Sequence, residues 1–155
     1  MLGDSVLLGV RDTLPGALTG WDVTVDTVGS RRLPQGIQVL RERRAEIGAV
    51  VVIMLGNNYI AGEGSYAAQI DQAMQVLTGV SRVVWLTLPE RWASRVEINA
   101  AIRAAPARWP AIVVAEWAVE VAAHPEYAAD MLHLGPSGRE AILRLIAAAV
   151  GPAPP

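Results

Sequence analysis

The 155-residue sequence contains no cysteine, no lysine and no long hydrophobic run. Without cysteine, the chain forms neither disulfides nor thiolate metal sites, and its redox compartment stays undetermined. No stretch has the roughly 20 consecutive apolar residues that a membrane-spanning helix needs, and no signal peptide is visible. The net charge of −2 excludes a strongly basic face, so we expect no nucleic-acid partner. Arginine supplies all of the basic residues, which we interpret as the bias of a GC-rich genome.

The composition is that of a globular domain with a substantial core. Hydrophobic residues make up 52% of the chain and charged residues 18%, which is typical of a folded protein rather than a disordered one. The length suits one domain better than two. We expect a single domain over residues 1–150, followed by a short tail over residues 151–155.

Short apolar runs alternate with helical patterns along the chain. Strands are expected at 21–28, 49–55, 82–88 and 111–116, in addition to a short apolar start at Met1-Leu2. Helices are expected at 6–18, 34–47, 65–77, 96–105 and 136–150. This alternation predicts a three-layer α/β domain with a parallel sheet. Because ligands bind at the carboxyl ends of such strands, residues that follow the strands are candidates for a site.

Gly3-Asp4-Ser5 lies where the first apolar stretch turns into a helix. A serine there projects above the end of the sheet, and it can attack a carbonyl if a base is near and backbone amides stabilise the oxyanion. The same tripeptide also suits an ordinary helix start, since Asp and Ser are preferred N-caps and Gly favours turns.

The candidate base is His133, with Asp130 as its partner. At a spacing of three residues, the two side chains face the same way in a turn or helical loop. Asp130 can then hold Nδ1–H of His133 and leave Nε2 for the Ser5 hydroxyl. The alternative is a turn capped by Asp130 with a polar surface histidine. The other histidine, His124, lies in a polar loop without such a partner, and we interpret it as solvated.

Two further residues follow strands and supply candidate oxyanion donors beside the Ser5 amide. Gly29 allows the backbone to approach a substrate closely, and the Asn58 side chain can donate a hydrogen bond. Each is also a common turn residue. Their joint order with Ser5 and Asp130-x-x-His133 favours a catalytic site.

These residues resemble the four motif blocks of the SGNH (GDSL-type) hydrolases: Gly3-Asp4-Ser5, Gly29, Gly56-Asn57-Asn58 and Asp130-Met131-Leu132-His133. The resemblance covers nearly the whole chain. It implies an α/β/α sandwich with a mostly parallel, flavodoxin-like five-stranded sheet, and acyl-ester hydrolysis or acyl transfer without cofactor or metal. It also implies the roles of Ser5 as nucleophile, His133 as base and Asp130 as its partner. The Ser5 amide, the Gly29 amide and Asn58 would form the oxyanion hole.

The third block departs from the Gly-x-Asn-Asp pattern of the family, because Tyr59 follows Asn58. This raises the question of how that loop is held. The segments GDSVLLG, VDTVGSRR, VVIMLGNN, LPERW with the later Asn99, and DMLHLGPSG carry a narrower resemblance. They resemble SGNH domains attached to acyltransferase-3-type membrane proteins, which are extracytoplasmic and help O-acetylate cell-envelope polysaccharides. This resemblance makes Asn57, Trp92 and Arg31 candidates for the substrate rim. The alternatives are a packing role for Trp92 and a solvated pair for Arg31-Arg32, which we favour for the arginines.

Only Met1 and Leu2 precede Gly3, whereas strands usually have about five or six residues. We therefore expect a central first strand that continues upstream of Met1, with a membrane acyltransferase portion as a candidate partner in the same native chain. Two other functions remain open. One is a non-catalytic SGNH-like interaction module. The other is a nucleotide-binding α/β domain, against which no G-x-G-x-x-G or P-loop follows a strand.

Overall fold

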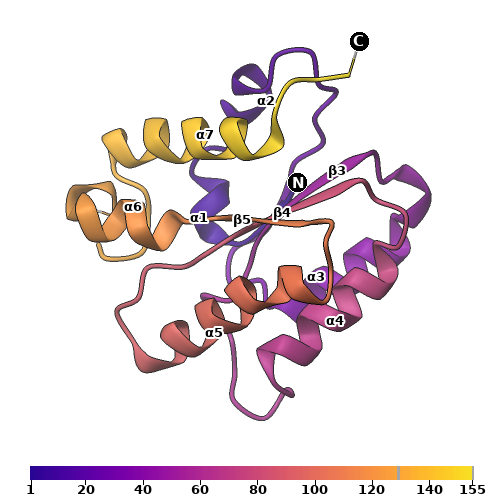
Figure 1. Ribbon diagram of the computed structural model, residues 1–155. Coiled ribbons are helices and arrows are strands. Elements are labelled where there is room, and N and C mark those ends of the chain that lie inside the picture. Colours follow the sequence, from indigo (N-terminus) through magenta and orange to yellow (C-terminus); the bar gives the residue numbers. More distant parts are fainter. Residues whose placement is uncertain (129, 155) are drawn as a thin grey trace.

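A computed structural model describes residues 1–128 and 130–154 (Figure 1). A five-stranded sheet forms its middle layer, in the order β2-β1-β3-β4-β5, and all neighbouring strands are parallel. The strands are β1 (Leu2–Gly3), β2 (Asp26–Thr27), β3 (Val50–Met54), β4 (Arg82–Leu86) and β5 (Ile112–Ala115). This is the flavodoxin-like strand order. The predicted three-layer α/β fold is confirmed.

Helices cover both faces of the sheet. They are α1 (Ser5–Leu8), α2 (Leu14–Ala17), α3 (Leu33–Glu42), α4 (Tyr66–Val76), α5 (Ala93–Ala104), α6 (Trp117–Ala123) and α7 (Pro136–Val150). Three short 3₁₀ turns lie at Arg44–Glu46, Ala105–Ala107 and Pro125–Tyr127. In Figure 1, α2, α6 and α7 lie on one side of the sheet and α3, α4 and α5 on the other. The middle strands are therefore covered on both faces.

The two longest strands lie in the middle of the core because their sequences are almost wholly apolar. Ile53 and Met54 of β3 and Trp85 of β4 have no exposed surface. The buried indole of Trp85 donates to the Tyr66 hydroxyl at 3.3 Å, and that hydroxyl donates to the Leu55 carbonyl oxygen at 2.6 Å. These bonds satisfy polar groups that would be costly to bury unpaired.

Three local predictions from the sequence were wrong. The helix expected over 6–18 is two short helices. Helix α1 ends at Leu8, and α2 begins at Leu14 with Pro15 in its first turn, where a missing N–H costs no helical hydrogen bond. The strand expected over 21–28 is paired only at Asp26–Thr27, since β1 offers it a partner over two residues. Helix α6 was not predicted. By contrast, α7 has the expected bounds.

Candidate active site

Ser5 is the first residue of α1, and only Asp4 separates it from the end of β1. The preceding Asp4 is fully buried and caps the helix, because its Oδ1 accepts a hydrogen bond from the Val6 amide at 3.0 Å. Gly3 allows α1 to fold back over the strand, since a Cβ there would lie 2.7 Å from the Cβ of Leu7. This sharp strand-to-helix turn leaves Ser5 half-buried at the carboxyl edge of the sheet.

His133 and Asp130 come to Ser5 from the segment before α7. His133 Nε2 lies 3.1 Å from Ser5 Oγ, and His133 Nδ1 lies 2.6 Å from Asp130 Oδ2. The other carboxylate oxygen of Asp130 accepts from the amides of Leu132 and His133, at 3.1 and 2.6 Å. The hydrogen bond from the His133 side chain, followed by that from its amide, lowers the pKa of Asp130 to about 2. Asp130 is thus ionised and in place to hold an Nδ1–H tautomer.

The backbone around His133 is tied to the start of α7. An antiparallel bridge joins Ala128 and Leu134, and the Gly135 amide donates to the Tyr127 carbonyl oxygen at 3.0 Å. Helix α7 lies directly against this carbonyl, because a Cβ on Gly138 would lie 2.0 Å from the same oxygen. Between Asp130 and His133, Met131 adopts a φ of 72°. The position of His133 therefore depends on close backbone packing.

The predicted oxyanion residues lie around the same edge. Val28, the residue before Gly29, donates its amide to the Gly3 carbonyl oxygen at 3.3 Å, which places this turn beside the end of β1. The Arg31 amide closes the turn on the Val28 carbonyl. Within this turn, Ser30 rather than Gly29 adopts the left-handed conformation, with a φ of 59°. The sequence did not reveal this, since serine seldom adopts such a conformation.

Asp4 explains how the loop after β3 is held without the usual aspartate. Its Oδ2 accepts hydrogen bonds from the Nδ2 atoms of Asn57 at 3.0 Å and Asn58 at 3.4 Å. Asn58 Nδ2 also lies 3.4 Å from the Arg31 carbonyl oxygen. Tyr59, in the place of the aspartate, donates its hydroxyl to the Gly64 carbonyl oxygen at 3.0 Å. The carboxylate of the first motif block thus anchors both asparagines of the third.

Burial raises the pKa of Asp4 above its usual value, although the hydrogen bonds from Val6 and Asn57 act in the opposite direction. The Asn57 amide is directed at this carboxylate rather than standing free at the rim. The two asparagines therefore compensate part of the cost of a buried charge.

The interpretation of Arg31 as solvated was wrong. Its side chain is buried, with 7% of the residue exposed. Its guanidinium forms an ion pair with Asp26 at 2.6 Å and donates to the backbone carbonyls of Asp26 and Gly3 at 2.8 and 3.4 Å. These bonds fix the turn after β2 against the end of β1, so the donors of Arg31 are directed into the protein.

Trp92 belongs to a loop over residues 89–92, here called the rim loop. The indole is half-exposed, and the guanidinium carbon of Arg95 lies 4.1 Å from the ring centroid, a cation–π arrangement. Arg91 of the same loop contacts the sulfur of Met131. Because Met131 lies between Asp130 and His133, the rim loop reaches the histidine segment. Trp92 thus lies at the surface, next to the residue that contacts the histidine segment, and not in the core.

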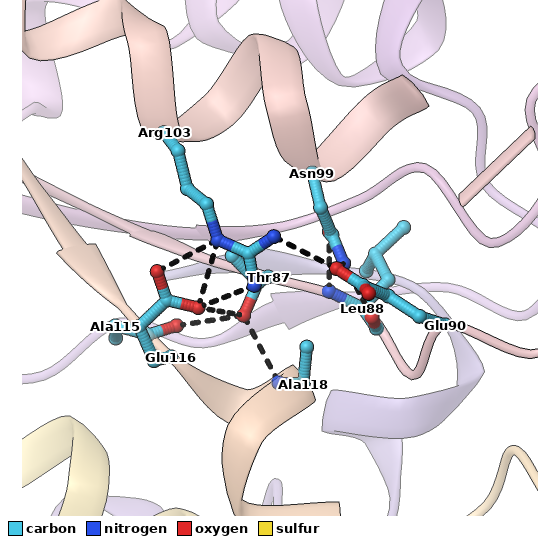
Figure 2. A network of polar contacts seen from close by, with 8 residues as sticks. All are labelled: Thr87, Leu88, Glu90, Asn99, Arg103, Ala115, Glu116 and Ala118. Carbon is cyan, nitrogen blue, oxygen red and sulfur yellow. Dashed lines mark hydrogen bonds and ion pairs between the residues drawn. The ribbon is translucent and has the colours of Figure 1, made fainter. Parts of the chain in front are cut away.

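A polar network anchors the rim loop to α5 (Figure 2). Glu90 Oε1 accepts from Asn99 at 2.9 Å and from Arg103 at 2.8 Å. Asn99 also pairs with both backbone polar groups of Leu88, and Arg103 reaches Glu116 at 2.9 Å. Hydrogen bonds, first from Asn99 and then from Arg103, lower the pKa of Glu90. Asn99 is part of the narrower family resemblance, but nothing in the sequence indicates that it holds Leu88 and Glu90 in this network.

His124 does have a carboxylate neighbour, contrary to the sequence interpretation. Its Nδ1 lies 3.3 Å from Glu126 Oε1, and its ring stacks on Tyr127 at 4.7 Å between centroids. Both of these side chains are exposed, as expected for a solvated histidine. Within residues 1–128 and 130–154, no three His, Asp or Glu side chains are grouped so as to hold a metal ion.

Three solved structures resemble the chain over nearly its whole length. The C-terminal catalytic domain of Streptococcus pneumoniae peptidoglycan O-acetyltransferase A, with a methylsulfonyl adduct, has 23% identity and a TM-score of 0.81, covering 96% of this chain and 89% of that one. A Veillonella parvula member of the lipolytic G-D-S-L family has 13% identity and a TM-score of 0.76, covering 93% and 92%. A family 3 carbohydrate esterase from Clostridium thermocellum has 14% identity and a TM-score of 0.69, covering 96% and 92%.

No family model matches the chain, and no curated protein matches it either. The three structural neighbours are all SGNH-type hydrolases. At sequence identities of 13% to 23%, these similarities show a shared fold and nothing finer. The chain therefore has the SGNH (GDSL-type) hydrolase fold, and the resemblance seen in its sequence is confirmed at that level.

Proposed function

We propose that this chain is a serine-dependent acyl-ester hydrolase or O-acyltransferase that works through an acyl-serine intermediate. One observation carries the proposal: Ser5 Oγ, His133 and Asp130 form a continuous line of contacts at 3.1 and 2.6 Å. This is the arrangement by which a neutral imidazole removes a serine proton while a carboxylate holds its other nitrogen.

In the first half of the reaction, His133 Nε2 accepts the hydroxyl proton as Ser5 Oγ bonds to the acyl carbon. The carbonyl electrons move to its oxygen, giving a tetrahedral oxyanion. As this intermediate collapses, the bond to the alcohol oxygen breaks, and His133 returns the proton to that oxygen. The acyl group remains on Ser5. Asp130 stays ionised and stabilises the imidazolium that forms in between.

The second half uses the same steps with a new nucleophile. Water releases the free acid and completes an esterase cycle, whereas a sugar hydroxyl completes a transferase cycle. In both halves, the Ser5 and Gly29 amides act as oxyanion donors. Asn58 Nδ2 joins them by turning one N–H away from its long contact with the Arg31 carbonyl, at 3.4 Å, while it stays anchored on Asp4. The proximity of the Val28–Arg31 turn to the end of β1 and the anchoring of Asn58 on Asp4 support this assignment.

We propose O-acetyl groups of cell-envelope glycans as the substrate class. Two of the structural neighbours are described as a peptidoglycan O-acetyltransferase and a carbohydrate esterase. The side chains of His133 and Asp130 are 49% and 59% exposed, which suits a polymer that approaches an open surface. Trp92 at the rim offers a flat apolar face on which a sugar ring can pack.

The proposal extends to location and partner. We propose an extracytoplasmic domain that works with a membrane acyltransferase portion of the same native chain, which would deliver the acyl group. Among the helices that the structure describes, none is both long and apolar enough to cross a membrane.

A fluorophosphonate probe with mass mapping tests the catalytic proposal directly. We expect labelling at Ser5 in the native protein and none in Ser5→Ala, with both proteins equally folded by circular dichroism. Unlabelled, well-folded native protein would instead support a non-catalytic module. Full esterase activity in Ser5→Ala would refute the mechanism. Acetyl release, compared with acetyl transfer to added glycans, then separates hydrolase from transferase.

A further inference from the structure

Arg95 is a buried arginine without an acidic partner. Only 6% of the residue is exposed, yet no carboxylate within residues 1–128 and 130–154 lies within ion-pair distance of its guanidinium. Its one side-chain hydrogen bond in that part of the chain runs from Nη1 to the Pro89 carbonyl oxygen, at 3.5 Å. A guanidinium carries five N–H donors. Because an unpaired buried charge is costly, the arrangement calls for a ligand.

The neighbouring carboxylates are engaged elsewhere. Figure 2 shows Glu90 of the rim loop held by Asn99 and Arg103, at 2.9 and 2.8 Å. Both oxygens of Asp4 accept hydrogen bonds from other groups. Burial lowers the pKa of Arg95, and the charge of Asp4 opposes this effect only in part. Neither carboxylate therefore neutralises Arg95 by direct contact.

The guanidinium of Arg95 lies at the N-terminal end of α5. It contacts the Pro89 carbonyl and lies over the Trp92 ring, and both of these residues precede the helix. This helix of twelve residues has no side-chain cap and no acidic residue in its first turn. Among the described residues, the amides of Ala93 and Ser94 have no backbone partner. Since a helix N-terminus attracts anions and disfavours cations, the helix and the guanidinium both favour an anion at one place.

This place lies at the same edge of the sheet as Ser5. Only β3 separates β1, which leads into Ser5, from β4, which leads into the rim loop. The pairing register ends both strands at the same level, and at about 4.8 Å between neighbouring strands their ends are about 10 Å apart. Leu88 packs against Gly56, because a Cβ on this glycine would lie 2.8 Å from Leu88 Cδ1. A sugar chain can therefore contact Ser5 and Arg95 together.

The guanidinium keeps a narrow contact with solvent despite its burial. Its nitrogens are not among the enclosed, unpaired side-chain atoms of the described residues. Trp92, whose ring centroid lies 4.1 Å from the guanidinium carbon, is itself half-exposed. One face of the indole meets Arg95, which leaves the other face for a sugar ring.

We propose that Arg95, the amides at the start of α5 and the Trp92 ring form a subsite for an anionic group, a carboxylate or a phosphate carried by a sugar of the glycan. The planar guanidinium can bind two oxygens of such a group at once. The proposal rests on the proposed function, whose substrate class it narrows to anionic glycans. Arg95 is thus a binding residue, and no bond is made or broken at it.

The test titrates the protein with glucose, glucuronate and glucose 6-phosphate at pH 7 in about 0.15 M salt. Two NMR signals report binding, the Nε–H of Arg95 and the indole N–H of Trp92, which Arg95→Gln and Trp92→Phe assign. We expect at least one anionic sugar to shift both signals with a Kd of about 1–10 mM. Glucose should bind at least about tenfold more weakly, because it makes no charge-assisted hydrogen bond. A response to one anionic sugar alone identifies the group as carboxylate or phosphate.

Two arginine variants separate a specific subsite from a general effect of charge. Arg95→Gln should abolish the response of the Trp92 signal to the anionic sugars. Arg41→Gln removes the same charge from an exposed position on α3, and its Kd should stay within a factor of two of the native value. Equal weakening in both variants would overturn the proposal. Equal binding of all three sugars to the native protein would overturn it as well, even if Arg95→Gln fails to fold.

The binding measurement needs no turnover, so the fluorophosphonate probe keeps this proposal apart from the catalytic one. Labelling of Ser5 without anion-selective binding would refute the subsite alone. Anion-selective binding at Arg95 without labelling of Ser5 would refute the catalytic proposal, and with it the link between the subsite and acyl transfer.

Discussion

Replacing Gly138 by alanine should displace His133 without altering its side chain. The variant therefore tests whether catalysis depends on the position of this histidine. The added Cβ would lie 2.0 Å from the Tyr127 carbonyl oxygen and 2.7 Å from its carbon. A Cβ essentially never lies within 3.0 Å of such an atom, so the start of α7 and the Tyr127 carbonyl must move apart by about 1 Å or more. The obstacle is backbone, and no rotamer change can relieve it.

The shift must reach the catalytic segment, because the Gly135 amide bonds to the same Tyr127 carbonyl. We expect overpacking to lower the free energy of unfolding by about 1–3 kcal/mol. A displacement of about 1 Å at His133 should lower kcat/KM for an aryl acetate by about 100-fold. Urea denaturation and esterase assays at 25 °C measure the two effects, and they should be made well below the Tm of the variant.

Gly16→Ala is the matched control, since Gly16 is also helical and nothing lies within 4 Å of its added Cβ. That variant should keep full activity and be as stable as the native chain or more stable by about 0.4–1 kcal/mol. The reasoning is refuted if Gly138→Ala keeps its activity within a factor of two. It is also refuted if both glycine variants lose activity to the same extent.

Three further changes test other parts of the site. Asn58→Ala should lower kcat by about 10²–10³-fold through the lost oxyanion donor, and an unchanged kcat in a folded protein would remove Asn58 from the mechanism. Because the pKa of Asp130 is held near 2, Asp130→Asn should lower kcat by about 10⁴-fold throughout the neutral range, and a loss confined to low pH would contradict this. Arg103→Gln should lower the free energy of unfolding by about 1 kcal/mol at pH 7. The two carboxylates that Arg103 binds have pKa values lowered from 4.5, so this difference should be present above pH 4.5 and vanish as pH falls through the lower folded values; a constant difference from pH 7 to pH 3 would refute it.

The sheet could be predicted from sequence where strands are long and buried on both faces. The runs at 49–55 and 82–88 are apolar at nearly every position, and they became β3 and β4. The same reasoning failed at 21–28, where the alternating pattern is strand-like but a paired neighbour is available only at its end. Helix α6 was missed because neither a clear amphipathic pattern nor a side-chain cap marks it; Glu116 at its N-cap makes no capping bond.

Around the site, the order and spacing of the candidate residues along the sequence indicated which of them belong together. The sequence did not indicate which hydrogen bonds and ion pairs hold them in place. The spacing of Asp130 and His133 allowed their contact to be expected, because three residues bring two side chains to one side of a turn. The burial of Arg31 could not be expected, since its partners include the carboxylate of Asp26 and a backbone carbonyl at the carboxyl end of β1, 28 residues earlier in the chain. Nor does any local signal show that Asp4 holds both asparagines.

By itself, the sequence determined the α/β class, the positions of the long strands along the chain and the set of candidate residues. These follow from hydrophobic periodicity and from residue types that act within a few positions of one another. Only the tertiary structure decided that Ser5 and His133, 128 residues apart, lie 3.1 Å from each other. It alone decided which arginines are buried and which residue of the 28–31 turn is left-handed. Such features depend on contacts between distant segments, whose free energies no local pattern contains.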